Sequence, residues 1–355
     1  RSRWGLSAMP HTAGPVAALL VLHERPAPVP TRPPSSPLSP AGGPAREVPL
    51  PPGPAVWGIA DNPQRDLATM PAKLDAMARL GVGMLRMDLS LTPAAEATVR
   101  DARARGIRVL GVVYGPRDPA AYAAHAARVA RRFAPLGVHH YEVWNEPNLP
   151  HFWPAARDPE RGVRAYTALV RAAYPAIKGA DPASTVIVGA LSRHEVDGGR
   201  PNEWLERMYE LGARGRFDAV SVHPYSMPDL PGAKTPRAAV WQQIAGFGSL
   251  RSPSMRTLMV ARGDGAKAIW ITEFSAPTSD NPLAVSPARQ AAIAAAGVAR
   301  AEAMPFLGGF FWYQLRDSTA AGRDHFGLLR ADGTPKPAYA VYARALARAR
   351  AEGTP

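Results

Sequence analysis

The feature that most constrains this chain is a regular alternation of short apolar runs with longer amphipathic stretches, from Ala55 almost to the C-terminus. Eight of the apolar runs have the length of strands rather than of core helices. They cover residues 55–61, 83–90, 107–114, 139–146, 185–192, 218–225, 268–275 and 306–314. Strands that alternate with helices predict a parallel sheet with the helices outside it.

The stretches between these runs have the marks of helices. Residues 118–137 and 286–305 each open with Asp or Ser before Pro, an N-cap followed by a proline in the first turn. Glycines such as Gly81, Gly106 and Gly137 stand where a helix ends and the next strand begins, as expected of helix C-caps. Eight strand–helix units in about 300 residues fit a closed (β/α)8 barrel, the TIM barrel. An open, doubly wound sheet is the alternative, but no glycine-rich phosphate loop follows the first run.

The first 54 residues predict no folded core. Arg1 and Arg3 precede an apolar run at residues 13–22, which has the length of the hydrophobic part of a signal peptide. Residues 26–54 contain 12 prolines in 29 positions and predict an extended, disordered linker. We therefore expect a signal or membrane-anchor remnant in residues 1–25, a linker over 26–54 and one catalytic domain over 55–350. The expected location is secreted or at the cell surface.

The chain is basic, with 42 Lys and Arg against 29 Asp and Glu, a formal net charge of +13. Such a charge can attract nucleic acid or an acidic polymer. No zinc-finger spacing, basic zipper helix or aromatic ribonucleoprotein motif accompanies it, so we expect no nucleic-acid partner and interpret arginine mainly as a solvating cation. Polyanion binding stays open as an alternative. The absence of cysteine excludes disulfides and thiolate metal sites.

Polar residues gather where the predicted strands end. In a (β/α)8 barrel the loops after the strands build the active site. A packed strand has little reason to hold unpaired charges, because burying them is costly. The second, fourth, sixth, seventh and eighth runs end with Arg86 and Asp88, Asn145 and Glu146, His223 and Tyr225, Glu273, and Trp312.

Two carboxylates on opposite sides of a barrel mouth suit the cleavage of a glycosidic bond. One carboxyl protonates the leaving oxygen, and the other attacks the anomeric carbon or activates water. Their surroundings must differ, so that one stays protonated and the other ionised. We expect Arg86 and Tyr225 to keep Glu273 ionised. Glu146 stands beside Trp144, in less polar company, and its neighbour Asn145 can bond a sugar hydroxyl.

These residues resemble the clan A glycoside hydrolases, and most of all families 39 and 5, the xylosidase-like and cellulase-like groups. "WNEPN" at 144–148 is similar to the clan's acid/base signature, and "WITEF" at 270–274 is similar to its nucleophile signature. The resemblance covers nearly all of residues 55–345. It implies a retaining (β/α)8 enzyme with Glu146 as acid/base, Glu273 as nucleophile and a poly- or oligosaccharide as substrate.

The resemblance also implies supporting roles. Arg86, His223 and Tyr225 match the clan's strand-two arginine and strand-six His-x-Tyr, and Trp312 matches the tryptophan that floors the subsite at the cleavage point. Family 5 usually has histidine at the end of strand three, where this chain has Tyr114, so the substrate subsite stays open. The chemistry needs no cofactor and no metal. A zinc site from His140, His151 and His223 is conceivable, but the sequence offers no ligand spacing for one.

Aromatic residues near the strand ends are candidates for stacking on a sugar ring. Core packing is the competing interpretation for each of them. Trp153, just past Glu146, is the best candidate, and the others are Trp57, Tyr114, Phe152, Phe274 and Tyr313. A barrel that binds sugar without turnover is the alternative function, although a site for binding alone has no need of both carboxylates.

Overall fold

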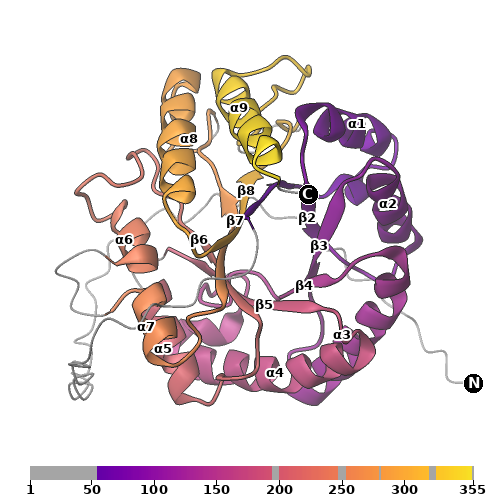
Figure 1. The fold of residues 1–355 in the computed structure, drawn as a ribbon, viewed down its shortest axis with the longest axis vertical. Coiled ribbons are helices and arrows are strands. Elements are labelled where there is room, and N and C mark those ends of the chain that lie inside the picture. Colours follow the sequence, from indigo (N-terminus) through magenta and orange to yellow (C-terminus); the bar gives the residue numbers. More distant parts are fainter. Residues whose placement is uncertain (1–53, 194–199, 247–252, 280, 320–324, 354–355) are drawn as a thin grey trace, which may run out of the picture.

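The computed structural model describes residues 54–193, 200–246, 253–279, 281–319 and 325–353, and the predicted signal segment and linker lie outside these ranges apart from Pro54. Eight strands form a closed barrel in the order β1 to β8, each parallel to its neighbours, with β8 paired to β1. The helices surround this barrel on all sides (Figure 1). The expected (β/α)8 barrel is confirmed.

Each of the eight predicted strands is present, in most cases trimmed by one or two residues at its ends. The strands are β1 Val56–Ala60, β2 Met84–Asp88, β3 Arg108–Val113, β4 His140–Val143, β5 Thr185–Ser192, β6 Ala219–His223, β7 Ala268–Phe274 and β8 Leu307–Tyr313.

Helices connect the strands, and two short ones lie between β6 and β7. They are α1 Met70–Leu80, α2 Pro93–Ala104, α3 Pro119–Phe133, α4 Pro159–Ala180, α5 Pro201–Glu210, α6 Ala239–Ala245, α7 Met255–Ala261, α8 Pro287–Glu302 and α9 Pro337–Ala351. The side chains of Asp118 and Ser286 accept the backbone N–H three residues on, and therefore cap α3 and α8 as predicted. Gly81, at φ 83°, ends α1 in the left-handed conformation that glycine adopts without strain.

Two apolar layers hold the barrel together. The larger lies between the strands and the helices, where Tyr342 of α9 donates its hydroxyl proton toward Gly58 O at 2.6 Å and lies 3.1 Å from Phe310 O. The smaller fills the barrel, where Trp270 stacks on Phe311 with ring centroids 6.1 Å apart. Successive strand residues point to opposite layers, so one parity of each strand faces the barrel axis and the other faces the helices.

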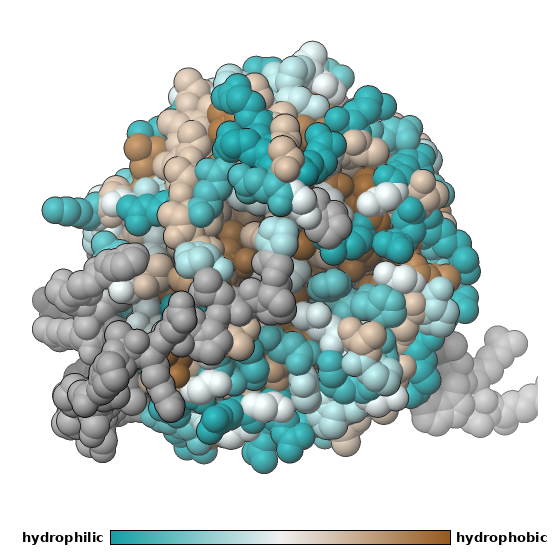
Figure 2. Space-filling model, in the orientation of Figure 1, coloured by the Kyte–Doolittle hydropathy of each residue, from teal (hydrophilic) through white to brown (hydrophobic). Residues whose placement is uncertain are grey.

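The surface in Figure 2 is mostly hydrophilic over the surrounding helices, with hydrophobic residues visible toward the centre of the face. Among the helices of the described ranges, none is both long enough and apolar enough to cross a membrane.

Candidate active site at the carboxyl ends of the strands

The end of β4 turns sharply where the acid/base signature begins. The strand stops at Val143, three residues before its predicted end. Trp144 and Glu146 follow with φ of 68° and 44°, in the left-handed region that side-chain-bearing residues adopt rarely, at a cost of about 1–2 kcal/mol each. This turn brings Glu146 Oε1 to 2.9 Å from His223 Nδ1 at the end of β6. Strained backbone of this kind is common at functional sites.

The end of β7 carries a bulge. Its register against β8 shifts between Ile271 and Phe274, so that β7 has one extra residue in this stretch. Such a bulge re-aims the side chains around it. Ile271 and Phe274 pack in the outer apolar layer, whereas Thr272 and Glu273 both bond to polar residues at the barrel mouth.

Glu273 is held by two donors and lies beside a third polar group. Arg86 Nη1 lies 2.6 Å from its Oε1, and the Tyr225 hydroxyl donates to its Oε2 at 2.8 Å. His223 Nδ1 is 3.8 Å from the same Oε2. Burial acts to raise the pKa of Glu273, but His223, Arg86 and the hydrogen bonds from Tyr225 and Arg86 hold that pKa below its ordinary value. Burial, together with the charge of Glu273, raises the pKa of Tyr225 well above its ordinary value, so this hydroxyl stays a donor.

A third glutamate, which the sequence analysis missed, lies beneath the site. Glu142 of β4 is fully buried, and its Oε2 is 2.6 Å from Arg86 Nε. Its Oε1 accepts from Thr272 Oγ1 at 2.9 Å. The third nitrogen of the Arg86 guanidinium, Nη2, donates a hydrogen bond to Asn145 Oδ1 at 2.7 Å. Burial would lower the pKa of Arg86, but the charges of Glu142 and Glu273 raise it above its ordinary value, so the guanidinium remains a fixed cation between the two carboxylates.

Two tyrosines flank the carboxylates. Tyr114 and Tyr313 are half-buried. Burial raises the pKa of each; the charge of Asp88 and then that of Glu273 raise the pKa of Tyr114 further, and the charge of Glu273 raises that of Tyr313. Beside them Arg65 and Asp88 form an ion pair at 2.5 Å. The barrel mouth therefore offers aromatic rings and a charged pair next to the carboxylates.

Trp312 does not line this site, contrary to the expectation. Its side chain is fully buried, its Nε1 donates to Phe326 O at 3.0 Å, and its ring meets those of Phe274 and Tyr342 in the outer layer. The cause is strand alternation, because Trp312 has the parity that faces the helices. Tyr313, one residue later, faces the barrel mouth in its place.

Trp153 is not available for stacking either. It is 1% exposed, its Nε1 donates to Gly162 O at 3.2 Å, and its ring packs on Trp144 with centroids 4.9 Å apart. Trp57 and Phe274 are also core residues. For these rings the core-packing interpretation is the correct one.

One cluster of the described residues has the donor geometry of a metal site. One carboxylate oxygen each of Glu146 and Glu273 and one ring nitrogen of His223 all lie within 4.8 Å of one another. His140 and His151 do not belong to this cluster. Glu273 already accepts hydrogen bonds from Arg86 and Tyr225, and Glu146 is paired with a ring nitrogen of His223. The donor set therefore suits proton transfer and nucleophilic chemistry at least as well as metal binding.

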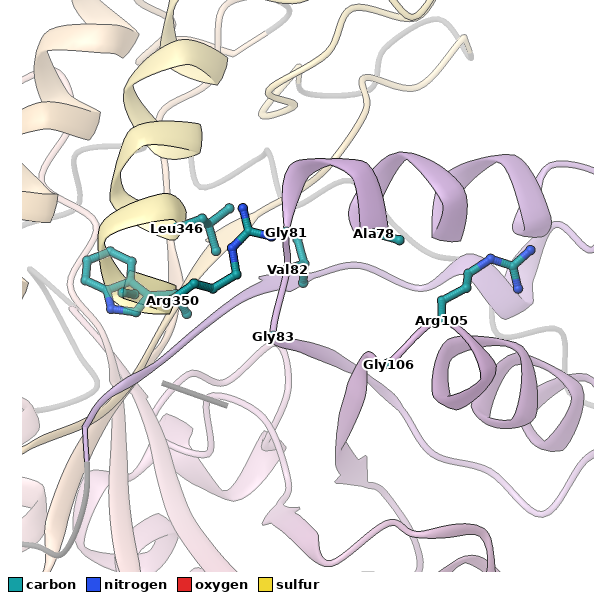
Figure 3. Close-up of a pocket in the computed structure, with 10 residues that line it drawn as sticks. Ala78, Gly81, Val82, Gly83, Arg105, Gly106, Leu346 and Arg350 are labelled. Atoms are coloured by element: carbon teal, nitrogen blue, oxygen red, sulfur yellow. The ribbon is translucent and has the colours of Figure 1, made fainter. Parts of the chain in front are cut away.

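A separate pocket lies at the opposite end of the barrel (Figure 3). Two of the residues that line it are Gly83, directly before β2, and Gly106, two residues before β3, whereas Arg86 and its partners gather at the carboxyl ends of the strands. The side chain of Arg350 reaches from the end of α9 against Gly81. This amino-terminal end of a barrel ordinarily contributes stability rather than catalysis.

Comparison with known proteins identifies the family. The model of the glycosyl hydrolase catalytic core matches residues 120–342, which is more than half of the chain and includes Glu146, His223, Tyr225 and Glu273. This chain belongs to the glycosyl hydrolase catalytic core family. The resemblance to clan A glycoside hydrolases drawn from the motifs is thereby confirmed.

A curated relative of this chain is the beta-xylosidase of Geobacillus stearothermophilus. The two are 26% identical over 221 residues, which is 57% of this chain and 40% of the relative. The chain therefore spans less than half the length of that enzyme.

Solved structures share the fold. A family 39 glycoside hydrolase from Bacteroides cellulosilyticus WH2 superposes with a TM-score of 0.60 at 21% identity, over 82% of this chain and 63% of that one. A monomeric beta-xylosidase from Caulobacter crescentus CB15 gives 0.59 at 17% identity, over 81% and 67%. Xylanase 10B from Thermotoga maritima gives 0.56 at 16% identity, over 84% and 96%. At these identities the likeness establishes the barrel fold.

Proposed function

We propose that this protein is a retaining glycoside hydrolase that cleaves β-linked glycosidic bonds in an oligo- or polysaccharide. The observation that carries the proposal is that the two facing carboxylates, Glu146 and Glu273, have different hydrogen-bond partners. Glu273 is held ionised by Arg86 and Tyr225, whereas Glu146 has a histidine nitrogen as its partner. One carboxylate is thus suited to attack and the other to proton transfer.

The separation of the carboxylates supports retention of configuration. An oxygen of Glu146 and one of Glu273 lie within 4.8 Å. Retaining enzymes hold their two carboxyl groups roughly 5–5.5 Å apart, whereas inverting enzymes leave roughly 6.5–9.5 Å for a water. An oxygen–oxygen distance of this size is nearer to the retaining range than to the inverting one, which supports a double displacement.

The reaction then has two steps. Glu273 attacks the anomeric carbon while Glu146 gives its proton to the leaving oxygen, and the glycosidic bond breaks to leave a covalent glycosyl-enzyme. In the second step Glu146 takes a proton from water, the resulting oxygen attacks the anomeric carbon, and Glu273 departs as a carboxylate. Asn145, whose amide oxygen is bonded to Arg86, presents its NH2 as a donor for a sugar hydroxyl.

The test is hydrolysis by the full chain of aryl β-glycosides and of β-linked neutral and acidic polysaccharides. Aryl β-xylosides come first, because a curated relative is a beta-xylosidase. Glu146→Gln and Glu273→Gln are compared with Glu352→Gln, an exposed glutamate at the end of α9.

We expect both site variants to lower activity on unactivated substrates by about 10²-fold or more, since acid–base catalysis alone contributes about 10²–10⁴-fold. The control should match the unaltered protein. Activity indifferent to both site changes would contradict the proposal, and sugar binding without any turnover would favour the non-catalytic barrel.

A further inference from the structure

A line of buried hydrogen bonds runs beneath Glu146 and involves two residues to which the reaction assigns no role. His223 Nδ1 faces Glu146 Oε1 at 2.9 Å, and the other ring nitrogen, Nε2, lies 3.0 Å from Thr272 Oγ1. Thr272 in turn donates to Glu142 Oε1 at 2.9 Å. Glu142 is fixed from its other side by Arg86 Nε at 2.6 Å. His223, Thr272 and Glu142 are each 0% exposed, so water does not compete for these bonds.

The direction of each bond follows from counting protons. A carboxylate paired with arginine is an acceptor only, and a threonine hydroxyl has a single proton to donate. Because Thr272 gives that proton to Glu142, it can only accept from His223. Nε2 of His223 therefore carries a proton.

The state of Nε2 determines what Nδ1 can do. With Nε2 protonated, a neutral ring has a bare lone pair at Nδ1, 2.9 Å from a carboxyl oxygen of Glu146. Two acceptor atoms make such a contact only when a proton lies between them. His223 and Glu146 consequently hold one proton in common. The other charged groups near the ring are Glu273, whose Oε2 is 3.8 Å from Nδ1, and the Glu142–Arg86 pair.

We propose that Thr272 and Glu142 are positioning residues that keep a proton on Nε2 of His223, so that His223 and Glu146 share the single proton used in the acid step. The proposal rests on the proposed function for its catalytic consequence. In the first step this proton passes through Glu146 to the leaving oxygen as the bond to the anomeric carbon breaks. In the second step water returns one proton to the Glu146–His223 pair, and the proton on Nε2 stays in place throughout.

The first test detects the proton on Nε2 of His223 directly by NMR and needs no substrate. Thr272→Val removes the hydroxyl at nearly constant volume, and Thr272→Ser retains it as the matched control. The full chain is labelled with ¹⁵N-histidine, and the imidazole signals of residue 223 are assigned by their loss in His223→Gln.

We expect a protonated Nε2 in the unaltered protein and in Thr272→Ser. In Thr272→Val, Nε2 no longer has an acceptor, so its proton should be lost to solvent while the proton shared with Glu146 settles on Nδ1. An unprotonated Nε2 in the unaltered protein, or a Thr272→Val spectrum identical to it, would overturn the proposal.

The second test separates a positioning role from a merely structural one by the leaving group. A 2,4-dinitrophenolate departs without a proton, whereas an alkyl alkoxide requires one. For Thr272→Val we expect kcat/KM on an alkyl β-glycoside to fall about tenfold or more, the worth of one buried hydrogen bond, with less than a roughly twofold change on the dinitrophenyl glycoside. Thr272→Ser should restore most of the loss.

Equal losses on both substrates would overturn the positioning role. Absence of turnover in the unaltered protein would defeat the proposed function, while the ¹⁵N spectra would still decide where the proton lies.

Discussion

Replacing Tyr225 by phenylalanine removes one hydroxyl from the site and leaves the ring in place. The ring packs edge-on against Phe326, with centroids 6.1 Å apart, and against His223 at 6.3 Å, so the variant should keep its fold. What is lost is the hydrogen bond of 2.8 Å to Oε2 of Glu273. A hydrogen bond to a charged group contributes about 1.5–3 kcal/mol, which corresponds to a roughly 10- to 150-fold fall in kcat/KM if it is fully used in the transition state.

The same variant changes the pH dependence in a predictable direction. Glu273 attacks as a carboxylate, so activity is lost on the acid side as the pH falls through the pKa of this residue. The hydroxyl of Tyr225 is one of the groups that lower that pKa. Without this hydroxyl the pKa of Glu273 rises, and the acid limb of the kcat/KM profile should move to higher pH. Arg86 and His223 still lower that pKa in the variant, so only part of the lowering is lost.

The assay is kcat/KM against pH on the best aryl glycoside, with Tyr209→Phe as control, because that hydroxyl bonds Asp264 away from the site. An acid limb that stays in place or moves to lower pH in Tyr225→Phe would refute the reasoning.

Three further variants test the placement of other residues. Arg86→Met leaves Glu142 and Glu273 buried without their cation and should lower the free energy of unfolding by about 3–5 kcal/mol in a urea titration; a loss below 1 kcal/mol would contradict the buried ion pairs. Trp312→Ala should cost about 3–5 kcal/mol of stability through the cavity it leaves, with KM of the folded protein little changed. Tyr313→Ala should instead change stability little and raise KM about two- to tenfold, which corresponds to the loss of one aromatic contact with the substrate. A larger rise in KM from Trp312→Ala than from Tyr313→Ala would show that Trp312, and not Tyr313, contacts the substrate.

The fold was predictable because the barrel is encoded in a repeated local pattern. Eight apolar runs with helical stretches between them leave few other architectures, and the carboxyl ends of parallel strands must meet at one mouth. The meeting of Arg86, Glu146, His223 and Glu273 follows from that topology, since each lies within three residues of the carboxyl end of its strand. The true end of β4 was not predictable, because the left-handed backbone at Trp144 has no marker such as glycine or asparagine.

The placement of Trp312 was wrong because the sequence of its strand does not show which side chains face the barrel axis. The run "FFWY" at 310–313 has no polar residue to show which side faces the axis, so Trp312 was assigned to the mouth in place of Tyr313. Glu142 did carry a signal. In "HYEV", His140 and Glu142 alternate with Tyr141 and Val143, which marks a polar face directed at the barrel axis. That pattern could have predicted a buried carboxylate, although its partner Arg86 could not be identified without the fold.

The central claim is that Glu273 attacks the sugar and Glu146 then activates water, so that two displacements occur at one carbon. The most direct measurement is ¹H NMR of the first-formed product during cleavage of an aryl β-glycoside, recorded before the anomers equilibrate. The account predicts that the β anomer appears first and that its fraction then falls toward equilibrium. Initial appearance of the α anomer would show a single displacement and contradict the assignment of Glu273 as nucleophile.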